Sequence, residues 1–307
     1  MSDIGCLPVL PSALEHKLQH PLTNVRSAPV GIAKDVIHGS SKFLAELLSK
    51  HLGTGGQRVR ARLAWNAACS LKLNEQTGMA LACCCEWLHN ASLIHDDIQD
   101  GDMVRRDKPA LWVTAGLGSA ICAGDALIAA AYGVLREVQV SPDRLRMLLE
   151  LVEEAIRRTV TGQLADLSGQ QTVIRSLVTY EGVAADKAGP LLSLPLTLAL
   201  SASSCSGERQ DMTALADLVM THLGIAYQLL DDLRDWNQDR RADGRQIANA
   251  VLIQLQHCPS TEAAAAVSRR ARQRLREAEK CAAALPSGLR GLIDWLIADL
   301  ESQLNVV

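Results

Sequence analysis

Apolar residues recur at helical spacing along nearly the whole chain, whereas strand-type alternation is never sustained beyond a few residues. This periodicity predicts helices rather than sheets. The predicted helices span residues 28–51, 57–71, 75–98, 119–138, 142–169, 174–185, 187–203, 209–237, 244–256, 260–283 and 287–304. Turn-forming residues separate them, and no linker composition divides the chain. We therefore expect one large all-α domain over residues 1–307, with roughly the first ten residues as a flexible arm.

Composition and charge narrow the class of protein. Hydrophobic residues make up 48% of the 307 residues and aromatic residues 3%, and 31 Lys and Arg against 34 Asp and Glu give a net charge of −3. Without a general basic field, we expect no nucleic-acid partner. The nine Cys form no CxxC pair, which favours free thiols in a reducing compartment. The first residues lack signal-peptide features and the apolar run at about 191–202 is short, so we expect a cytoplasmic protein without a membrane span.

The predicted helix over residues 75–98 is apolar almost all round, and its polar residues are not scattered. His89, Ser92, Asp96 and Asp100 fall at helical spacing and form one stripe, with Asp97 turned about 100° away. The same D-D-x-x-D pattern recurs on the predicted helix over 209–237. Its polar face carries Thr221, Gln228, Asp231 or Asp232, and Asp235.

Carboxylates one helical turn apart repel each other and need a counter-charge when they leave water. Hard divalent cations with oxygen ligands are the natural candidates, and Mg²⁺ takes one or two carboxylates with water and substrate phosphate. A single cluster of this kind is equally typical of an acidic helix end that is exposed to water. Two copies on apolar helices favour a site for Mg²⁺ ions and a diphosphate.

Basic residues accompany the acidic clusters. Arg105 and Arg106 directly follow the first cluster, and guanidinium groups suit phosphate oxygens. Upstream, a Gly-rich turn over residues 53–56 leads into a helix, which presents backbone N–H groups and the positive dipole end to an anion. That helix carries Arg58, Arg60 and Arg62, and Lys187 heads an apolar run further on. Surface arginines and a snorkelling lysine are the alternative interpretation.

With these residues in view, the chain resembles the trans-isoprenyl diphosphate synthases, also called the polyprenyl synthetase family. The resemblance covers about residues 55–239 and lies in the segments GGQRVR, LIHDDIQDGDMVRRDKP, AGDALIAAAYGVL, GQLADL and YQLLDDLRD. It implies an all-α fold around a deep central cavity, a homodimer and a transferase of isoprenoid biosynthesis. The implied reaction is head-to-tail condensation of isopentenyl diphosphate with an allylic diphosphate, which gives a linear trans-prenyl diphosphate.

The resemblance also implies roles for individual residues. About three Mg²⁺ ions per active site would be held by Asp96, Asp100 and Asp231, with support from Asp97, Asp232 and Asp235. The allylic diphosphate would be held by Arg105, Lys187 and Gln228. Isopentenyl diphosphate would be held by Arg60, His89 and Arg106, beside position 57. Gln163 would lie near the reacting carbons.

Four departures from the family pattern concern the second substrate and the closing loop. Gln57 stands where the family has Lys, Ala61 replaces Pro, and Ala188 replaces Thr. The segment over residues 237–251 lacks the Gly-Lys and Gly-x-Asp pattern of the family. The candidates to replace its lysine are Arg240, Arg241 and Arg245.

Family logic sets product length by the side chains below the first cluster. Ala91 and Ser92, five and four residues before Asp96, are small, and Leu88 and Trp87 lie one turn deeper. A floor at Trp87 or Leu88 predicts a C20 product, geranylgeranyl diphosphate. Tyr132 on a neighbouring helix would shorten it, and Trp87 in ordinary core would not act as a floor.

Two other functions stay open. A terpene cyclase on this scaffold would ionise a prenyl diphosphate without isopentenyl diphosphate, which Gln57 favours. Nine aromatic residues leave few rings to stabilise cyclising cations, which favours linear elongation. A non-catalytic subunit that modulates an active synthase would not need to keep carboxylates that repel each other.

Overall fold

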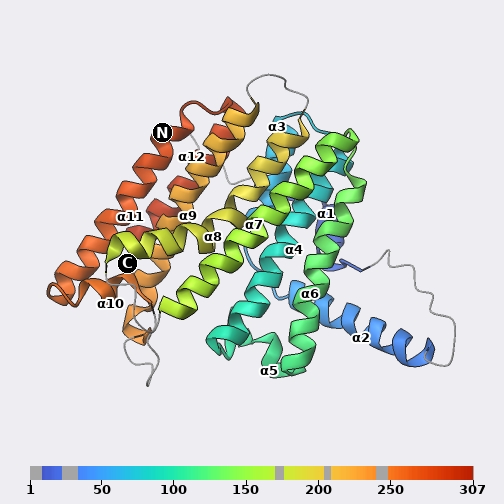
Figure 1. Ribbon diagram of the computed structural model, residues 1–307, viewed down its shortest axis with the longest axis horizontal. Coiled ribbons are helices and arrows are strands. Elements are labelled where there is room, and N and C mark those ends of the chain that lie inside the picture. Colours follow the sequence, from blue (N-terminus) through green and yellow to red (C-terminus); the bar gives the residue numbers. More distant parts are fainter. Residues whose placement is uncertain (1–8, 23–33, 170–175, 204–208, 240–247, 307) are drawn as a thin grey trace. The chain divides into compact units, whose positions relative to one another are not determined.

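The computed structural model describes residues 9–22, 34–169, 176–203, 209–239 and 248–306. Nearly all of these residues are helical (Figure 1), which confirms the all-α prediction. Contacts divide the chain into an N-terminal unit, mainly residues 8–69 and 73–141, and a C-terminal unit, mainly residues 70–72 and 142–307. The single domain and its deep cavity stay predictions.

The N-terminal unit is built around the long helix α4, against which α6 packs along much of its length (Figure 1). Its helices are α1 (Ser12–Gln19), α2 (Lys34–Leu52), α3 (Val59–Ser70), α4 (Glu75–Asp100), α5 (Leu111–Ala115), α6 (Leu117–Val134) and the 3₁₀ turn η1 (Leu135–Glu137). A two-stranded hairpin of β1 (Val104–Arg105) and β2 (Lys108–Pro109) follows α4. Residues 80–88 of α4 are all buried, as expected for a helix that is apolar on every side.

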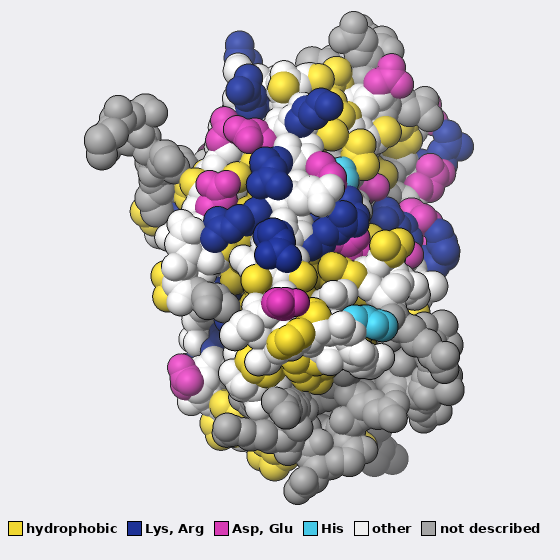
Figure 2. All heavy atoms as spheres, turned by 90° about the vertical axis from the view of Figure 1, so that its left-hand side faces the viewer, with side chains coloured by type: hydrophobic (Ala, Val, Ile, Leu, Met, Phe, Trp, Pro, Cys, Tyr) yellow, Lys and Arg dark blue, Asp and Glu magenta, His cyan; other side chains and the backbone are white. Residues whose placement is uncertain are grey.

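The C-terminal unit contains α7 (Pro142–Gly169), α8 (Leu177–Ala202), α9 (Arg209–Asp239), α10 (Ala250–Gln254), α11 (Ser260–Ala282) and α12 (Ser287–Leu304). Helix α8 packs against both α7 and α9, and α9 packs in turn against α11 (Figure 1). Figure 2 faces α11 and α12, where Lys and Arg side chains lie among Asp and Glu side chains; Arg269, Arg276 and Lys280 are exposed residues of α11. This mixture is typical of a solvated helix face.

The sequence pattern missed three features. The predicted helices over 174–185 and 187–203 are one helix, α8, although Pro190 and Pro195 each remove a backbone donor from its interior. Residues 189–202 are buried throughout, so packing outweighs that loss. Helices α1 and α5 were not predicted, and the helix predicted over 244–256 is only the short α10 where it is described. Arg240, Arg241 and Arg245 lie outside the described residues.

Three described helices are long and apolar enough to cross a membrane, by length and composition alone. They span Leu117–Glu137, Leu177–Ala202 and Asp211–Asn237. Within the fold, 33%, 72% and 50% of their apolar windows are buried, respectively. The burial of α8 is that of a helix in the core of a globular unit.

Candidate active site

The last turn of α4 carries the first acidic cluster. The helix begins at Asn74, whose side chain accepts the Thr77 N–H at 2.8 Å, and ends at Gly101, whose φ of 68° closes the last turn. Asp96 and Asp100 are partly exposed, whereas Asp97 is buried. Three carboxylates at the negative end of a helix dipole require a nearby cation.

Arg105 supplies that cation. Its Nε donates to Asp97 Oδ1 at 2.7 Å, its Nη2 also donates to this oxygen, and Nη2 lies 3.8 Å from Asp96 Oδ2. Burial raises the pKa of Asp97, and the hydrogen bonds from Arg105 oppose that rise. The guanidinium keeps 30% of its side-chain surface exposed. Asp97 therefore holds Arg105 beside the partly exposed Asp96.

A tight turn places the second arginine. Arg106 and Asp107 have φ values of 54° and 60° and connect β1 to β2, as in a type I′ turn. The Arg106 Nη1 donates to the Gly55 carbonyl. Gly56 has a φ of 114°, which strains any other residue, and the Arg106 guanidinium lies where its Cβ would be. The Gly-rich turn and the arginine pair thus come together in the N-terminal unit.

Glu86 on α4 fixes the start of α3. Its Oε1 accepts Arg58 Nη1 at 3.3 Å and Asn90 Nδ2 at 3.2 Å, and its Oε2 accepts the Ala61 N–H at 3.2 Å. Glu86 and the Arg58 side chain are both buried. Arg58 is therefore committed to Glu86, and the role of Arg60 stays a prediction.

Two histidines report the electrostatic field of this basic group. Burial lowers the pKa of His89 well below its usual value, and Arg60 and Arg106 lower it further. Burial, followed by Arg106 and Arg58, lowers the pKa of His51 to about 4. Both imidazoles are neutral at pH 7, because burial and then the neighbouring arginines disfavour their charged forms. Such a field suits an anion with several charges.

The second acidic cluster lies on α9 in the C-terminal unit. Asp235 is exposed and Asp231 is partly exposed, with Arg234 Nη1 at 3.4 Å from Asp231 Oδ1. Asp232 is buried and accepts the Ala250 N–H at 2.6 Å. Gln228 Nε2 lies 3.4 Å from the other Asp232 carboxylate oxygen. Asp232 thus fixes the start of α10, and the outer carboxylates remain accessible.

Lys187 is set by the crossing of α7 and α8. Its Nζ donates to Asp166 Oδ2 at 2.6 Å. An ideal Cβ at Gly162 would lie 2.3 Å from the Lys187 backbone nitrogen, so glycine is required where the two helices cross. Gln163 follows on α7, and among the described residues its buried Nε2 has no hydrogen-bond partner. These contacts bring Lys187 close to Asp166 and to the Gly162–Gln163 segment of α7.

The residues predicted to set product length lie on different sides of α4. Ser92 is partly exposed, and its hydroxyl donates to the His89 carbonyl at 2.8 Å. Ala91 and Leu88 are buried. The Trp87 indole N–H donates to the Leu18 carbonyl of α1 at 2.9 Å, so the ring is turned toward that helix.

The available ligands are typical of an open Mg²⁺ site and not of a metal site enclosed by protein side chains. Among the described residues, no three His, Cys, Asp or Glu side chains converge on one metal position. Asp96 and Asp100 lie one turn apart on α4, as do Asp231 and Asp235 on α9, and all four keep exposed surface. A pair of carboxylates with positions left for water and phosphate is the ligand set that Mg²⁺ prefers.

Sequence reasoning missed the residues that hold these groups. Glu86, Asn90 and Asp166 are polar residues within apolar helices, and that pattern was the available signal. Gln57 is exposed at the Gly-rich turn, as its position there suggested.

The fold and these residues define a class, the all-α transferases of prenyl groups. A family model for polyprenyl synthetase matches residues 41–284. The chain is 31% identical over 206 residues to farnesyl diphosphate synthase of Geobacillus stearothermophilus, covering 65% of this chain and 68% of the relative. It is 29% identical over 235 residues to geranylgeranyl diphosphate synthase of Cyanophora paradoxa, covering 74% and 77%. The chain belongs to the polyprenyl synthetase family.

The solved structures agree on the fold. Geranylgeranyl pyrophosphate synthetase from Geoglobus acetivorans superimposes with a TM-score of 0.77 at 19% identity, covering 95% of each chain. Decaprenyl diphosphate synthase from Rhodobacter capsulatus gives a TM-score of 0.74 at 18% identity, covering 96% of this chain and 95% of that one. At these identities the likeness concerns the fold alone.

Proposed function

We propose that this protein is a Mg²⁺-dependent trans-prenyl diphosphate synthase that condenses isopentenyl diphosphate head to tail with an allylic diphosphate. The observation that carries the proposal is the end of α4, where Asp97 holds Arg105 beside the partly exposed Asp96, one helical turn from Asp100. Opposite charges are kept close together there, and Asp96 and Asp100 keep exposed surface. That arrangement suits a metal–diphosphate complex.

In this proposal, Asp96, Asp100 and Asp231 hold about three Mg²⁺ ions, which neutralise charge on the departing diphosphate when bound. Arg105, Lys187 and Gln228 bind the allylic diphosphate, and Arg60, His89 and Arg106 bind isopentenyl diphosphate. Neutral His89 offers a donor without adding charge to the arginine cluster.

The reaction needs no protein nucleophile. The allylic C–O bond breaks, the electron pair leaves with the diphosphate, and the isopentenyl double bond attacks the resulting cation. One proton is then lost to the released diphosphate. Arg105 and Lys187 stabilise the charge that builds on the leaving group, and Gln163 lies near the reacting carbons. Excluding water from the site protects the cation.

We further propose a C20 product, a homodimer and a cytoplasmic location. Small residues at positions 91 and 92 support a product longer than C15. The Trp87 indole N–H binds the Leu18 carbonyl of α1. In this proposal, another part of the Trp87 ring contacts the end of the prenyl chain and limits its length. In this proposal, the three long apolar helices are core helices.

A terpene cyclase is the second candidate, and exposed Gln57 in place of the family's lysine is the observation that favours it. A modulatory subunit is less consistent with accessible, paired carboxylates. One assay separates the three functions. The purified protein is incubated with Mg²⁺, labelled isopentenyl diphosphate, and dimethylallyl, geranyl or farnesyl diphosphate, and a parallel reaction omits isopentenyl diphosphate.

A labelled C20 diphosphate is the expected product. Hydrocarbon formed in the reaction without isopentenyl diphosphate would establish the cyclase instead. Failure to elongate any primer, with no hydrocarbon, would leave the modulatory subunit.

A further inference from the structure

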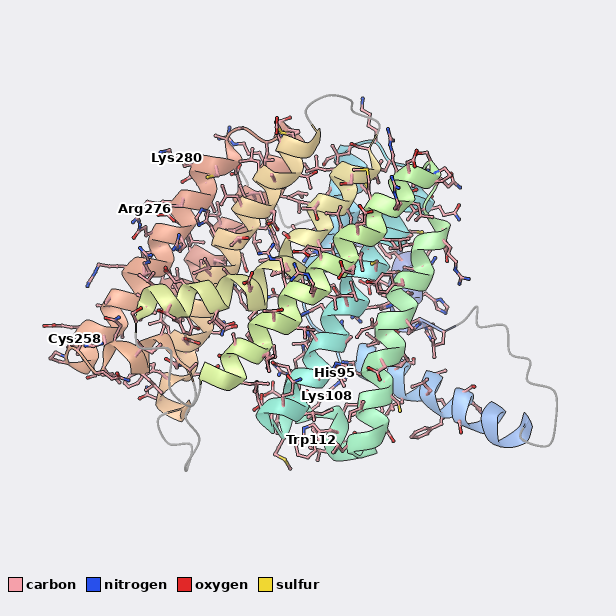
Figure 3. All side chains as sticks on the ribbon, in the orientation of Figure 1. His95, Lys108, Trp112, Cys258, Arg276 and Lys280 are labelled. Atoms are coloured by element: carbon pink, nitrogen blue, oxygen red, sulfur yellow. The ribbon has the colours of Figure 1, made fainter. Side chains whose placement is uncertain are left out.

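The residue just before the first acidic cluster contacts α6 at a glycine. An ideal Cβ at Gly124 would lie 2.2 Å from His95 Nε2, 2.7 Å from Cδ2 and 2.8 Å from Cε1. Real Cβ atoms do not approach other heavy atoms so closely. The imidazole therefore occupies the space that any side chain at position 124 would need, and Figure 3 labels His95 near α6.

This contact lies on the interface of α4 and α6. Positions 88, 91 and 95 share one face of α4. On α6 the buried positions opposite are small or aliphatic: Ala120, Ala123, Leu127 and Ala131. Such residues allow close helix packing but fix no particular angle at the helix end. The His95 ring packs directly against the Gly124 backbone, so a Cβ at position 124 would push the ring away from α6.

The His95 ring also has little polar attachment. Among the described residues, its buried Nε2 has no hydrogen-bond partner, and Asp125 Oδ1 lies 3.8 Å away, beyond hydrogen-bond range. Its position in the N-terminal unit is therefore defined by the close contact with Gly124.

The last turn of α4 is thus held from two sides. The Asp97 carboxylate is bound by Arg105 of the hairpin, and His95 is seated against Gly124 of α6. Asp96 lies between His95 and Asp97 in the sequence, and Asp100 follows one helical turn after Asp96. A shift of the turn at His95 would move both carboxylates relative to Arg105.

We propose that His95 and Gly124 are positioning residues that fix Asp96 and Asp100 for binding of the metal–diphosphate complex. This inference rests on the proposed function. Neither residue touches substrate; they act through the backbone of the α4 terminus. Misplacing reacting groups by about 1 Å costs on the order of 100-fold in rate, so a methyl group at position 124 has a large effect.

The test compares Gly124→Ala with Gly118→Ala on the same helix, because a Cβ at Gly118 meets nothing within 4 Å. We expect Gly124→Ala to lower kcat by about 10- to 100-fold and to raise the Mg²⁺ concentration for half-maximal activity. The KM for isopentenyl diphosphate should change little, and Gly118→Ala should behave as the unmodified protein. Equal behaviour of the two variants would overturn the proposal.

The double variant His95→Ala/Gly124→Ala separates positioning from a general loss of structure. Removing the ring makes room for the methyl group, so the double variant should match His95→Ala alone and exceed Gly124→Ala in activity. This comparison also decides the case if Gly124→Ala does not fold. Additive losses, or a double variant that does not fold, would overturn the proposal.

A second readout keeps this test independent of the proposed function. The rise in thermal unfolding temperature on adding Mg²⁺ with inorganic diphosphate is measured for each variant. We expect a smaller rise for Gly124→Ala and recovery in the double variant. If the unmodified protein elongates no primer, the proposed function fails, and the thermal shifts still decide whether His95 and Gly124 position the carboxylates. An unchanged shift in Gly124→Ala would reject that role.

Discussion

Arg105 Nε lies 2.7 Å from Asp97 Oδ1, so the buried aspartate of the first cluster binds the arginine that follows it, and Asp96 and Asp100 stay accessible. This ion pair thereby positions a cation beside Asp96. Its removal should affect both stability and substrate binding.

Replacing Arg105 with Gln should leave the buried Asp97 carboxylate without its cation. We expect the free energy of unfolding to fall by about 3 kcal/mol at pH 7 and the KM for the allylic diphosphate to rise. Burial already raises the pKa of Asp97, and losing Arg105 raises it further, so the folded state gains stability by protonation as pH falls. The loss should therefore be smaller at pH 5 than at pH 8 in denaturant titrations.

Arg146→Gln is the matched control for this variant. Arg146 is an exposed arginine of α7 at 3.7 Å from Asp143, and such pairs contribute at most about 1 kcal/mol. A loss for Arg105→Gln that equals the control, or that grows at low pH, would contradict the role of Asp97.

Glu86→Gln should loosen the start of α3. The amide keeps an acceptor for one donor but loses the charge that holds Arg58, so the Gly-rich turn becomes less fixed. We expect the KM for isopentenyl diphosphate to rise by about tenfold, while the KM for the allylic diphosphate changes little. Steady-state kinetics with each substrate varied measure this split. Parallel changes in both constants would argue against a local effect.

Gln57→Lys restores the charge that the family carries at this exposed position. If residue 57 contacts isopentenyl diphosphate, the added ammonium should lower its KM by a few-fold, because a partly screened charge contact contributes about 1 kcal/mol. The effect should weaken as salt concentration rises. Lys substituted for exposed Gln76 on α4 controls for net charge. An unchanged KM would remove position 57 from the substrate site.

Glu181 should govern acid stability of the C-terminal unit. Its buried carboxylate accepts Arg270 Nε at 2.5 Å and Arg274 Nη2 at 2.7 Å, which joins α8 to α11. Burial acts to raise the pKa of Glu181, but the two arginines outweigh it and lower the pKa below 4.5. The stabilisation is therefore present above about pH 4.5 and is lost as pH falls through the lower folded-state pKa.

Glu181→Gln should accordingly cost about 3 kcal/mol at pH 7, and its difference from the unmodified protein should shrink below pH 4.5. Glu46→Gln is the control, since Glu46 pairs with Lys42 at 3.8 Å on an exposed face. A difference that stays constant down to pH 3 would show that the arginines do not set the pKa of Glu181.

Ser92→Phe tests product length. Ser92 shares the stripe of Asp96 and keeps exposed surface, so an aromatic ring there should block growth of the prenyl chain. We expect a shorter main product with kcat of the first condensation largely retained, measured by chromatography of the dephosphorylated products. Phe at position 93, which points to another side of α4, is the control. A C20 product from Ser92→Phe would remove this position from the growth path.

Much of the fold was predictable because helical periodicity is a local property. The bounds of α7, α11 and α12 follow from Pro142, Pro259 and Pro286 with the apolar period behind each. The continuity of α8 was not predictable, because burial against α7 and α9 outweighs Pro190 and Pro195. The type I′ turn at Arg106 was not predictable from the sequence, because arginine has no preference for positive φ.

The sequence by itself determined the helical class and the chemistry of the two acidic clusters, because spacing along a helix places carboxylates on one face. Only the tertiary structure decided which aspartates are accessible and which are fixed. Asp97 and Asp232 are buried and bind Arg105 and the start of α10, whereas their neighbours Asp96 and Asp231 remain partly exposed. That division depends on donors brought close by packing, such as the Ala250 N–H, and no local pattern encodes it.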